Sequence, residues 1–111
     1  MTSYAAGVLI LSQINNKIYV LLGKDHYNTY SDFGGKNEVV DMNNPIYTAG
    51  RELYEETCGS LTSIHENIDF LYKCPVVNSL SYTNKHYFMY VMFVIFEMYV
   101  NCLYSSIDIC L

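Results

Sequence analysis

The segment from Asn44 to Gly59 constrains the fold most, because it carries both ends of a predicted helix. Asn44 followed by Pro45 provides a favoured N-cap and a favoured first helical residue, and Gly59 stands where a left-handed C-terminal cap is expected. A helix is therefore predicted from about Pro45 to Cys58. One stripe of this helix can pack on a sheet, and it consists of Ile46, Ala49, Leu53 and Thr57.

Three carboxylates share one face of this helix. Side chains three and four positions apart stack on the same face, so Glu52, Glu55 and Glu56 fall in a sector about 100° wide. The positions four residues further on hold Glu56, Gly59 and Ser60, so no Lys or Arg separates the charges. A divalent cation would resolve the repulsion, and carboxylate oxygens suit Mg²⁺ or Mn²⁺. The pattern therefore predicts a metal site with room for substrate phosphates.

Two glycines precede the helix and can bring backbone close to a ligand, because neither Gly34 nor Gly35 has a Cβ. Lys36 and Glu38 stand beside them and could meet phosphate or each other, although loop residues of these types are usually solvated.

At these residues the chain resembles the Nudix hydrolases, whose box is G-x5-E-x7-R-E-U-x-E-E-x-G-U, with U aliphatic. Gly35 begins the match, and Asp41 stands where the family has Glu. Nine residues instead of seven separate Asp41 from the string Arg51-Glu52-Leu53, and Glu55-Glu56 then agree with the box. Cys58 holds the family's glycine place. The stretches 5–10 and 17–23 also look like the strands before the box, so the resemblance covers roughly the first three fifths of the chain.

The resemblance implies an α/β fold, a Nudix-type α/β/α sandwich with a mixed sheet. Residues 1–111 would form a single Nudix-like domain with its box at about 35–59. The family continues beyond this point with a closing helix, for which only residues 101–111 remain. If they cannot replace that helix, one apolar sheet face stays partly uncovered, which would drive self-association.

The resemblance also implies an activity, the Mg²⁺-dependent hydrolysis of a diphosphate linkage in a nucleoside diphosphate joined to another group. Glu52, Arg51 and Glu56 would be catalytic, with Glu52 ahead of Glu56 as general base. The metal ligands would be Glu52, Glu55, Glu56 and the backbone carbonyl of Gly35. Asp41 could cap a loop or hold a water molecule near the metal. Glu97 could add a carboxylate to the metals or be a strand-end charge that faces solvent.

The substrate class stays open, because loops outside the box recognise the second group. Nucleoside triphosphates, nucleotide sugars, dinucleotides, diphosphoinositol polyphosphates and the mRNA cap are candidates. The wording from Phe33 to Lys36, with Thr48-Ala49, resembles Nudix proteins of large DNA viruses, some of which remove caps. The alternative function is an inactive Nudix-derived binding module or gene fragment, which the Asp41 substitution, the insertion and the short end favour.

The composition indicates one small domain that lacks the basic surface of a nucleic-acid-binding protein. The chain has 111 residues, 51% of them apolar, and a formal charge of -5 from 11 acidic and 6 basic residues. So few cations favour a small phosphorylated substrate over a long nucleic acid. The four cysteines show no C-x-x-C spacing, which argues against structural zinc. No signal peptide is recognised, so a cytoplasmic location is expected.

Strands are predicted near 4–12 and 16–23, followed by a loop at 24–31. After the helix come a strand-like stretch at 68–72, an edge stretch containing Pro75, and a polar turn at 81–85. The apolar run 87–100 predicts a strand buried on both faces, with helices above and below the sheet. Glu97 interrupts this run, which is too short for the roughly 20 apolar residues that cross a membrane.

Overall fold

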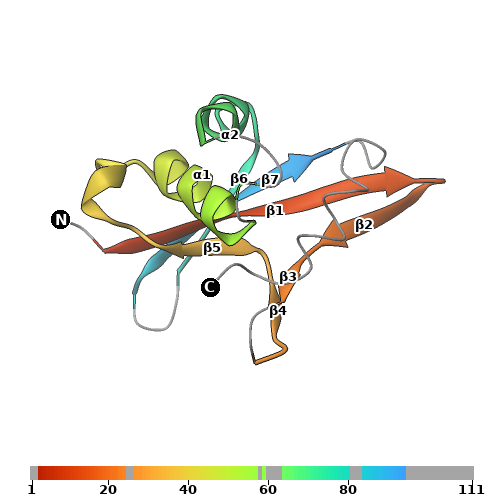
Figure 1. The fold of residues 1–111 in the computed structure, drawn as a ribbon, viewed down its shortest axis with the longest axis horizontal. Coiled ribbons are helices and arrows are strands. Elements are labelled where there is room, and N and C mark those ends of the chain that lie inside the picture. Colours follow the sequence, from red (N-terminus) through yellow and green to blue (C-terminus); the bar gives the residue numbers. More distant parts are fainter. Residues whose placement is uncertain (1–2, 25–26, 58, 60–63, 81–83, 95–111) are drawn as a thin grey trace.

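The computed structural model describes residues 3–24, 27–57, 59, 64–80 and 84–94, and they form a mixed α/β fold (Figure 1). The five strands of the main sheet are β1 (Tyr4–Ile14), β2 (Lys17–Leu21), β5 (Phe33–Lys36), β6 (Val76–Leu80) and β7 (His86–Phe93). A two-stranded ribbon pairs β3 (Gly23–Lys24) with β4 (Tyr30–Ser31). The helical elements are the 3-10 turn η1 (Val39–Asp41), α1 (Pro45–Glu56) and α2 (Ile64–Leu71).

The long strand β1 organises the sheet, in the order β2-β1-β7-β6. One edge of β1 pairs antiparallel with β5 along its first half and with β2 along its second half. Its other edge pairs with β7 in parallel, so the sheet is mixed, as predicted. Asn15 and Asn16 close the β1–β2 hairpin with φ angles of 50° and 67°, the left-handed conformation that two-residue hairpin turns favour.

The core lies on the face of the sheet that α1 covers (Figure 1). Ala6, Val8 and Ile10 alternate along β1 and are exposed by 2% or less, because every second side chain of a strand points to the same face. Ala49 and Leu53 of α1 pack into this core together with the other buried apolar side chains: Tyr4, Phe33, Leu71, Tyr90 and Met92. Strand β5 therefore lies directly beneath α1.

The termini of α1 agree with the predicted signals. The Asn44 side chain accepts a hydrogen bond of 3.0 Å from the Ile46 amide, which is the expected N-cap. Gly59 has a φ of 70°, and its amide donates to the Tyr54 carbonyl at 2.8 Å. The helix itself ends at Glu56, with Thr57 as its C-cap, slightly earlier than predicted.

The strand predicted at 68–72 is wrong, because this stretch belongs to α2 and the turn after it. The buried positions are Asn67 and Leu71, which are four residues apart as on one helix face. Phe70 and Tyr72, which lie in this stretch, are 47% and 59% exposed. The burial pattern of this segment therefore has the period of a helix and not that of a strand.

The opposite face of the sheet is more open than predicted. Strand β7 is not buried on both faces: Tyr90 and Met92 lie in the core, whereas Phe93 is 55% exposed. Helix α2 packs on α1, so both described helices lie on one side of the sheet. The predicted strand run beyond 94 and the closing segment 101–111 lie outside the described residues. Self-association through an open face stays a prediction.

An edge stretch containing Pro75 was predicted, and the edge strand β6 begins at the next residue, Val76. Within the described ranges, no helix is both long enough and apolar enough to cross a membrane.

Candidate functional site

The carboxylate face of helix α1 contacts strand β5, the glycine strand, which contains Gly34 and Gly35. A Cβ built on Gly35 would lie 2.6 Å from both Cδ and Oε1 of Glu52. This is closer than real Cβ atoms approach, so the Glu52 carboxylate occupies the space that a side chain at position 35 would fill. The glycine pair therefore brings strand backbone and a helix carboxylate together, as the sequence pattern suggests.

Glu56 is tied to the same strand one residue earlier. Its Oε2 accepts a hydrogen bond of 3.1 Å from the Gly34 amide. Burial raises the pKa of the Glu56 carboxyl to about 8, and the nearby charges of Glu52, Asp32 and Glu55 add to the increase. The Gly34 hydrogen bond opposes this shift but does not cancel it. At neutral pH, this end of the site therefore holds a proton that an ordinary glutamate would have lost.

Arg51 joins several of the predicted residues from the other end of the site. Its Nη1 donates to Glu52 Oε1 at 3.0 Å and to Glu55 Oε2 at 3.2 Å. The same nitrogen lies 2.6 Å from Glu38 Oε2. Nη2 donates to the backbone carbonyl of Lys36 at 3.1 Å. Arg51 is only 9% exposed, so it is a buried centre of this network and not a solvated surface charge.

Asp41 is the strongest partner of Arg51. Nε donates to Oδ1 and Nη2 to Oδ2, both at 2.9 Å, which is the bidentate geometry that a guanidinium prefers. Oδ2 also accepts from the Thr48 hydroxyl at 2.8 Å and from the Glu38 amide at 2.9 Å. The Tyr4 hydroxyl extends the chain of hydrogen bonds, at 3.0 Å from Thr48 Oγ1.

The pKa of Asp41 reflects this pairing. Burial by itself would raise the pKa, but the hydrogen bonds from Arg51, the Glu38 amide and Thr48 outweigh it and hold the pKa below its usual value. Asp41 is therefore a buried carboxylate that caps the η1 loop and holds Arg51. Of its two predicted roles, the loop cap is the one its contacts describe.

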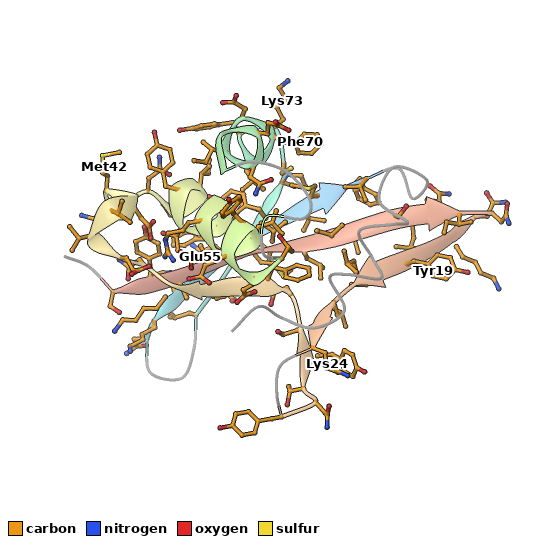
Figure 2. The ribbon with its side chains drawn as sticks, in the orientation of Figure 1. Tyr19, Lys24, Met42, Glu55, Phe70 and Lys73 are labelled. Carbon is orange, nitrogen blue, oxygen red and sulfur yellow. The ribbon has the colours of Figure 1, made fainter. Side chains whose placement is uncertain are left out.

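Glu55 and Lys36 lie at the margin of the site. Glu55 projects from α1 with a half-exposed side chain (Figure 2). Lys36 is exposed, and its backbone carbonyl joins the Arg51 network. Glu97, predicted as a further carboxylate, lies outside the described residues, as does Cys58.

Two residues beside the glycine strand were missed by sequence reasoning. The Tyr87 hydroxyl donates to Asp32 Oδ2 at 2.6 Å, and Asp32 is one of the charges that raise the pKa of Glu56. Asp32 stands directly before Phe33 and the glycine pair, which was a usable signal because the glycines were already singled out. Tyr87 is 55 residues away, and nothing local distinguishes it from the other tyrosines.

The residues present fit a hard divalent cation in kind. Glu52, Glu55 and Glu56 supply oxygen ligands on one helix face, and Gly35 brings a backbone carbonyl near them without a Cβ in the way. As these side chains stand, no group of three or more His, Cys, Asp or Glu side chains in the described part of the chain is arranged to hold a metal. Glu52 and Glu55 are turned toward Arg51, so binding would require these flexible side chains to rotate.

No protein-family model and no curated protein matches the chain. The class of protein is therefore inferred from the fold and the site. Together they define a mixed-sheet α/β domain in which a glutamate-rich helix lies against a glycine strand, with a buried arginine between the carboxylates.

Proposed function

We propose that the protein is a Mg²⁺- or Mn²⁺-dependent hydrolase of the diphosphate linkage in a nucleoside diphosphate joined to another group. The observation that carries this proposal is the placement of Glu52 and Glu56 against Gly35 and Gly34, where two carboxylates crowd a glycine backbone. The resemblance to the Nudix box supports it, and the Nudix-type α/β/α sandwich is the finer fold that belongs to the same proposal.

The charges around Glu56 are a second observation that supports the proposal. The raised pKa of Glu56 is caused first by burial and then by other carboxylates, so a cation at this point would relieve both the repulsion and the loss of solvation. Cation binding should displace the proton from Glu56. We therefore expect cation affinity to rise with pH up to about 8, with a proton released on binding.

Different residues of the chain would bind the cation, position the carboxylates and accept the proton. Glu52, Glu55, Glu56 and the Gly35 carbonyl would hold the cation. When bound, the cation supplies charge neutralisation at phosphate oxygens and lowers the pKa of water. Arg51, fixed by Asp41, holds Glu52 and Glu55 near the glycine strand before the cation arrives. Either Glu52, the favoured candidate, or Glu56 would take the proton from the attacking water.

The substrate is proposed to be small and phosphorylated. The candidates are nucleoside triphosphates, nucleotide sugars, dinucleotides, diphosphoinositol polyphosphates and the mRNA cap. Only 6 Lys and Arg residues are present in the chain, so a long nucleic acid would find little electrostatic attraction.

A substrate panel tests the proposal, with release of phosphate or pyrophosphate measured with and without Mg²⁺. Glu55→Gln and Glu56→Gln should each lower hydrolysis by roughly 100-fold or more, because each removes an electrostatic group from the site. Gln and Glu have similar helix propensity, so the fold should be retained. Asp69→Asn is the matched control, because Asp69 is exposed on α2 and should leave turnover unchanged. Near wild-type turnover of Glu56→Gln at saturating Mg²⁺ would refute the metal assignment.

An inactive Nudix-derived binding module is the second candidate, and one observation favours it. Arg51 already donates hydrogen bonds to Glu52 and Glu55, so both carboxylates have a cationic partner in the absence of a metal. Calorimetric Mg²⁺ titration separates the two functions. A hydrolase should bind Mg²⁺ more tightly when a nucleotide is present, whereas a binding module should bind the nucleotide equally well with a chelator.

A further inference from the structure

Strand β6 forms one edge of the main sheet. It pairs antiparallel with β7, and no other strand in the described part of the chain lies beside it. All five of its residues, Val76–Leu80, have exposed side chains, so neither face of the strand is covered. Such an edge presents a row of backbone N–H and C=O groups that can pair with a strand of another chain.

The pairing with β7 determines which backbone groups of β6 face outward. The Val91 amide donates to the Pro75 carbonyl at 2.9 Å, and the β6–β7 register, continued by one residue, places these two residues opposite each other. Hydrogen-bonded and non-hydrogen-bonded pairs alternate along an antiparallel ladder, so the odd-numbered residues of β6 bond to β7. The N–H and C=O groups of Val76, Asn78 and Leu80 therefore point away from β7, toward the free edge.

These outward-facing groups match those of a second copy of the same strand. When two copies run antiparallel with Asn78 opposite Asn78, Val76 of each copy lies opposite Leu80 of the other. All three outward-facing residues then form hydrogen-bonded pairs, and because each pair exchanges two hydrogen bonds, the contact contains about six. A register shifted by two residues leaves one of the three without a partner in the opposite β6. The symmetric register is therefore the one that satisfies the whole edge.

The sequence of β6 does not protect this edge. The strand has no charged residue, whereas β2 and β5, on the other side of the sheet, include Lys17 and Lys36. An edge lysine, or a proline whose nitrogen faces outward, discourages pairing with another chain. Pro75 does not act in this way, because its nitrogen lies on the β7 side together with its carbonyl. An uncharged strand suits a contact between identical chains, in which a charge near the symmetry axis would face its own copy.

We propose that β6 is the dimerisation edge of this protein and pairs antiparallel with β6 of a second copy about a two-fold axis at Asn78. The two sheets become one continuous sheet, and the contact closes because the same strand is used on both sides. Val76 of one copy packs beside Leu80 of the other, which covers side chains that are 48% and 57% exposed in the single chain. This dimer does not depend on the hydrolase assignment, and it uses edge hydrogen bonds instead of the apolar sheet face.

The first test uses the wild-type protein. A contact through one short strand is small, so sedimentation equilibrium should show a weak dimer that forms between roughly 10 µM and 1 mM protein. Amide hydrogen exchange by nuclear magnetic resonance should slow at Val76, Asn78 and Leu80 as the concentration rises, because these amides donate across the interface only in the dimer. The amides of β2 are the internal control, and their exchange rates should not depend on concentration.

The second test uses charges at the symmetry axis. Asn78→Lys and Asn78→Asp each place two like charges opposite each other, and each should weaken dimerisation by roughly 5-fold or more. An equimolar mixture of the two variants should dimerise again, because opposite charges then meet at the axis. Tyr19→Lys is the matched control, since Tyr19 is exposed on β2, and its dimerisation should equal that of the wild type.

Several results would overturn the proposal. A wild type that stays monomeric at roughly 1 mM would do so, whether its β6 edge is free or covered by another part of its own chain. Association that leaves the exchange of the three β6 amides unchanged would assign the contact to an apolar face instead. Association lost in Tyr19→Lys but kept in Asn78→Lys would place the contact on β2. If the variants at position 78 do not fold, amide exchange in the wild type decides the question.

Discussion

The carboxylates at the two ends of the carboxylate face of α1 have different surroundings. At the Arg51 end, a buried guanidinium contacts Asp41 at 2.9 Å through two nitrogens, and the pKa of Asp41 is lowered. At the Glu56 end, the carboxyl accepts a hydrogen bond from the Gly34 backbone amide, and burial together with other carboxylates raises its pKa to about 8. The ends lie on one helix, little more than one turn apart.

The Arg51 end therefore stabilises the folded protein, whereas the Glu56 end lowers its stability unless a ligand binds. Paired buried charges with satisfied hydrogen bonds hold the η1 loop and the helix in place. Crowded like charges oppose folding, and such arrangements gather at functional sites. The contrast predicts that substitutions at the Arg51 end will lower stability, whereas those at the Glu56 end will mainly change binding.

The largest expected effect is that of Arg51→Ala. It leaves Asp41, which is 2% exposed, as an uncompensated buried charge, so the free energy of unfolding should fall by about 3–5 kcal/mol. Urea denaturation at neutral pH measures the change. Arg51→Lys is the control, because it keeps the charge but loses the bidentate geometry and should cost less. A loss below about 1 kcal/mol for Arg51→Ala would remove the basis for the contrast.

A pair of glycine variants sharpens the comparison within β5. A Cβ at Gly34 would lie 2.9 Å from both the Ala6 carbonyl oxygen and the Gly7 Cα, which are backbone atoms that cannot move aside. Gly34→Ala should therefore lower stability by about 1–3 kcal/mol in thermal or urea unfolding.

Gly35→Ala should behave differently, because the atoms nearest to its Cβ would belong to the flexible end of Glu52. Stability should stay within about 1 kcal/mol of the wild type, since Ala is also the less costly residue in a strand. Hydrolysis and Mn²⁺ affinity should fall, because Glu52 is displaced. Equal stability losses in the two variants would show that Gly35 has a packing role only.

A further expected effect is a pH-dependent gain in stability of a Glu56 variant in the metal-free protein. The pKa of Glu56 is raised from 4.5 to about 8 in the folded state, so the folded protein holds a proton that the unfolded chain releases in this interval. Stability from this group is complete below 4.5 and is lost as the pH rises through about 8. Glu56→Gln should therefore become more stable than the wild type as the pH rises from 5 to roughly 9.

The Asp41 end should show the opposite sign. Because its folded pKa lies below 3.8, its contribution is present above that value and is lost as the pH falls through the folded pKa. Melting curves of Asp41→Asn and Glu56→Gln against pH measure both slopes, with Asp69→Asn as control. Parallel slopes in the two variants would contradict the charge contrast between the ends.

Local signals were enough for several parts of the fold. Asn44, Pro45 and Gly59 predicted the limits of α1 to within two residues, and the two strands of the first hairpin were predicted near 4–12 and 16–23. These predictions succeed because caps and two-residue turns depend on φ angles and hydrogen bonds among neighbours in the chain. Between 68 and 72 the local signal failed, because a short apolar alternation fits a strand as well as a helix until burial selects one face.

The sequence by itself determined that Glu52, Glu55 and Glu56 share a helix face, since the 3.6-residue period follows from covalent geometry and chirality. Only the tertiary structure decided what surrounds them. Pairing of β1 with β5 places Gly34 and Gly35 against one end of that face, and the η1 loop brings Asp41 to the other. Such contacts join residues that are far apart in the sequence, and they depend on strand register and packing that no single segment encodes.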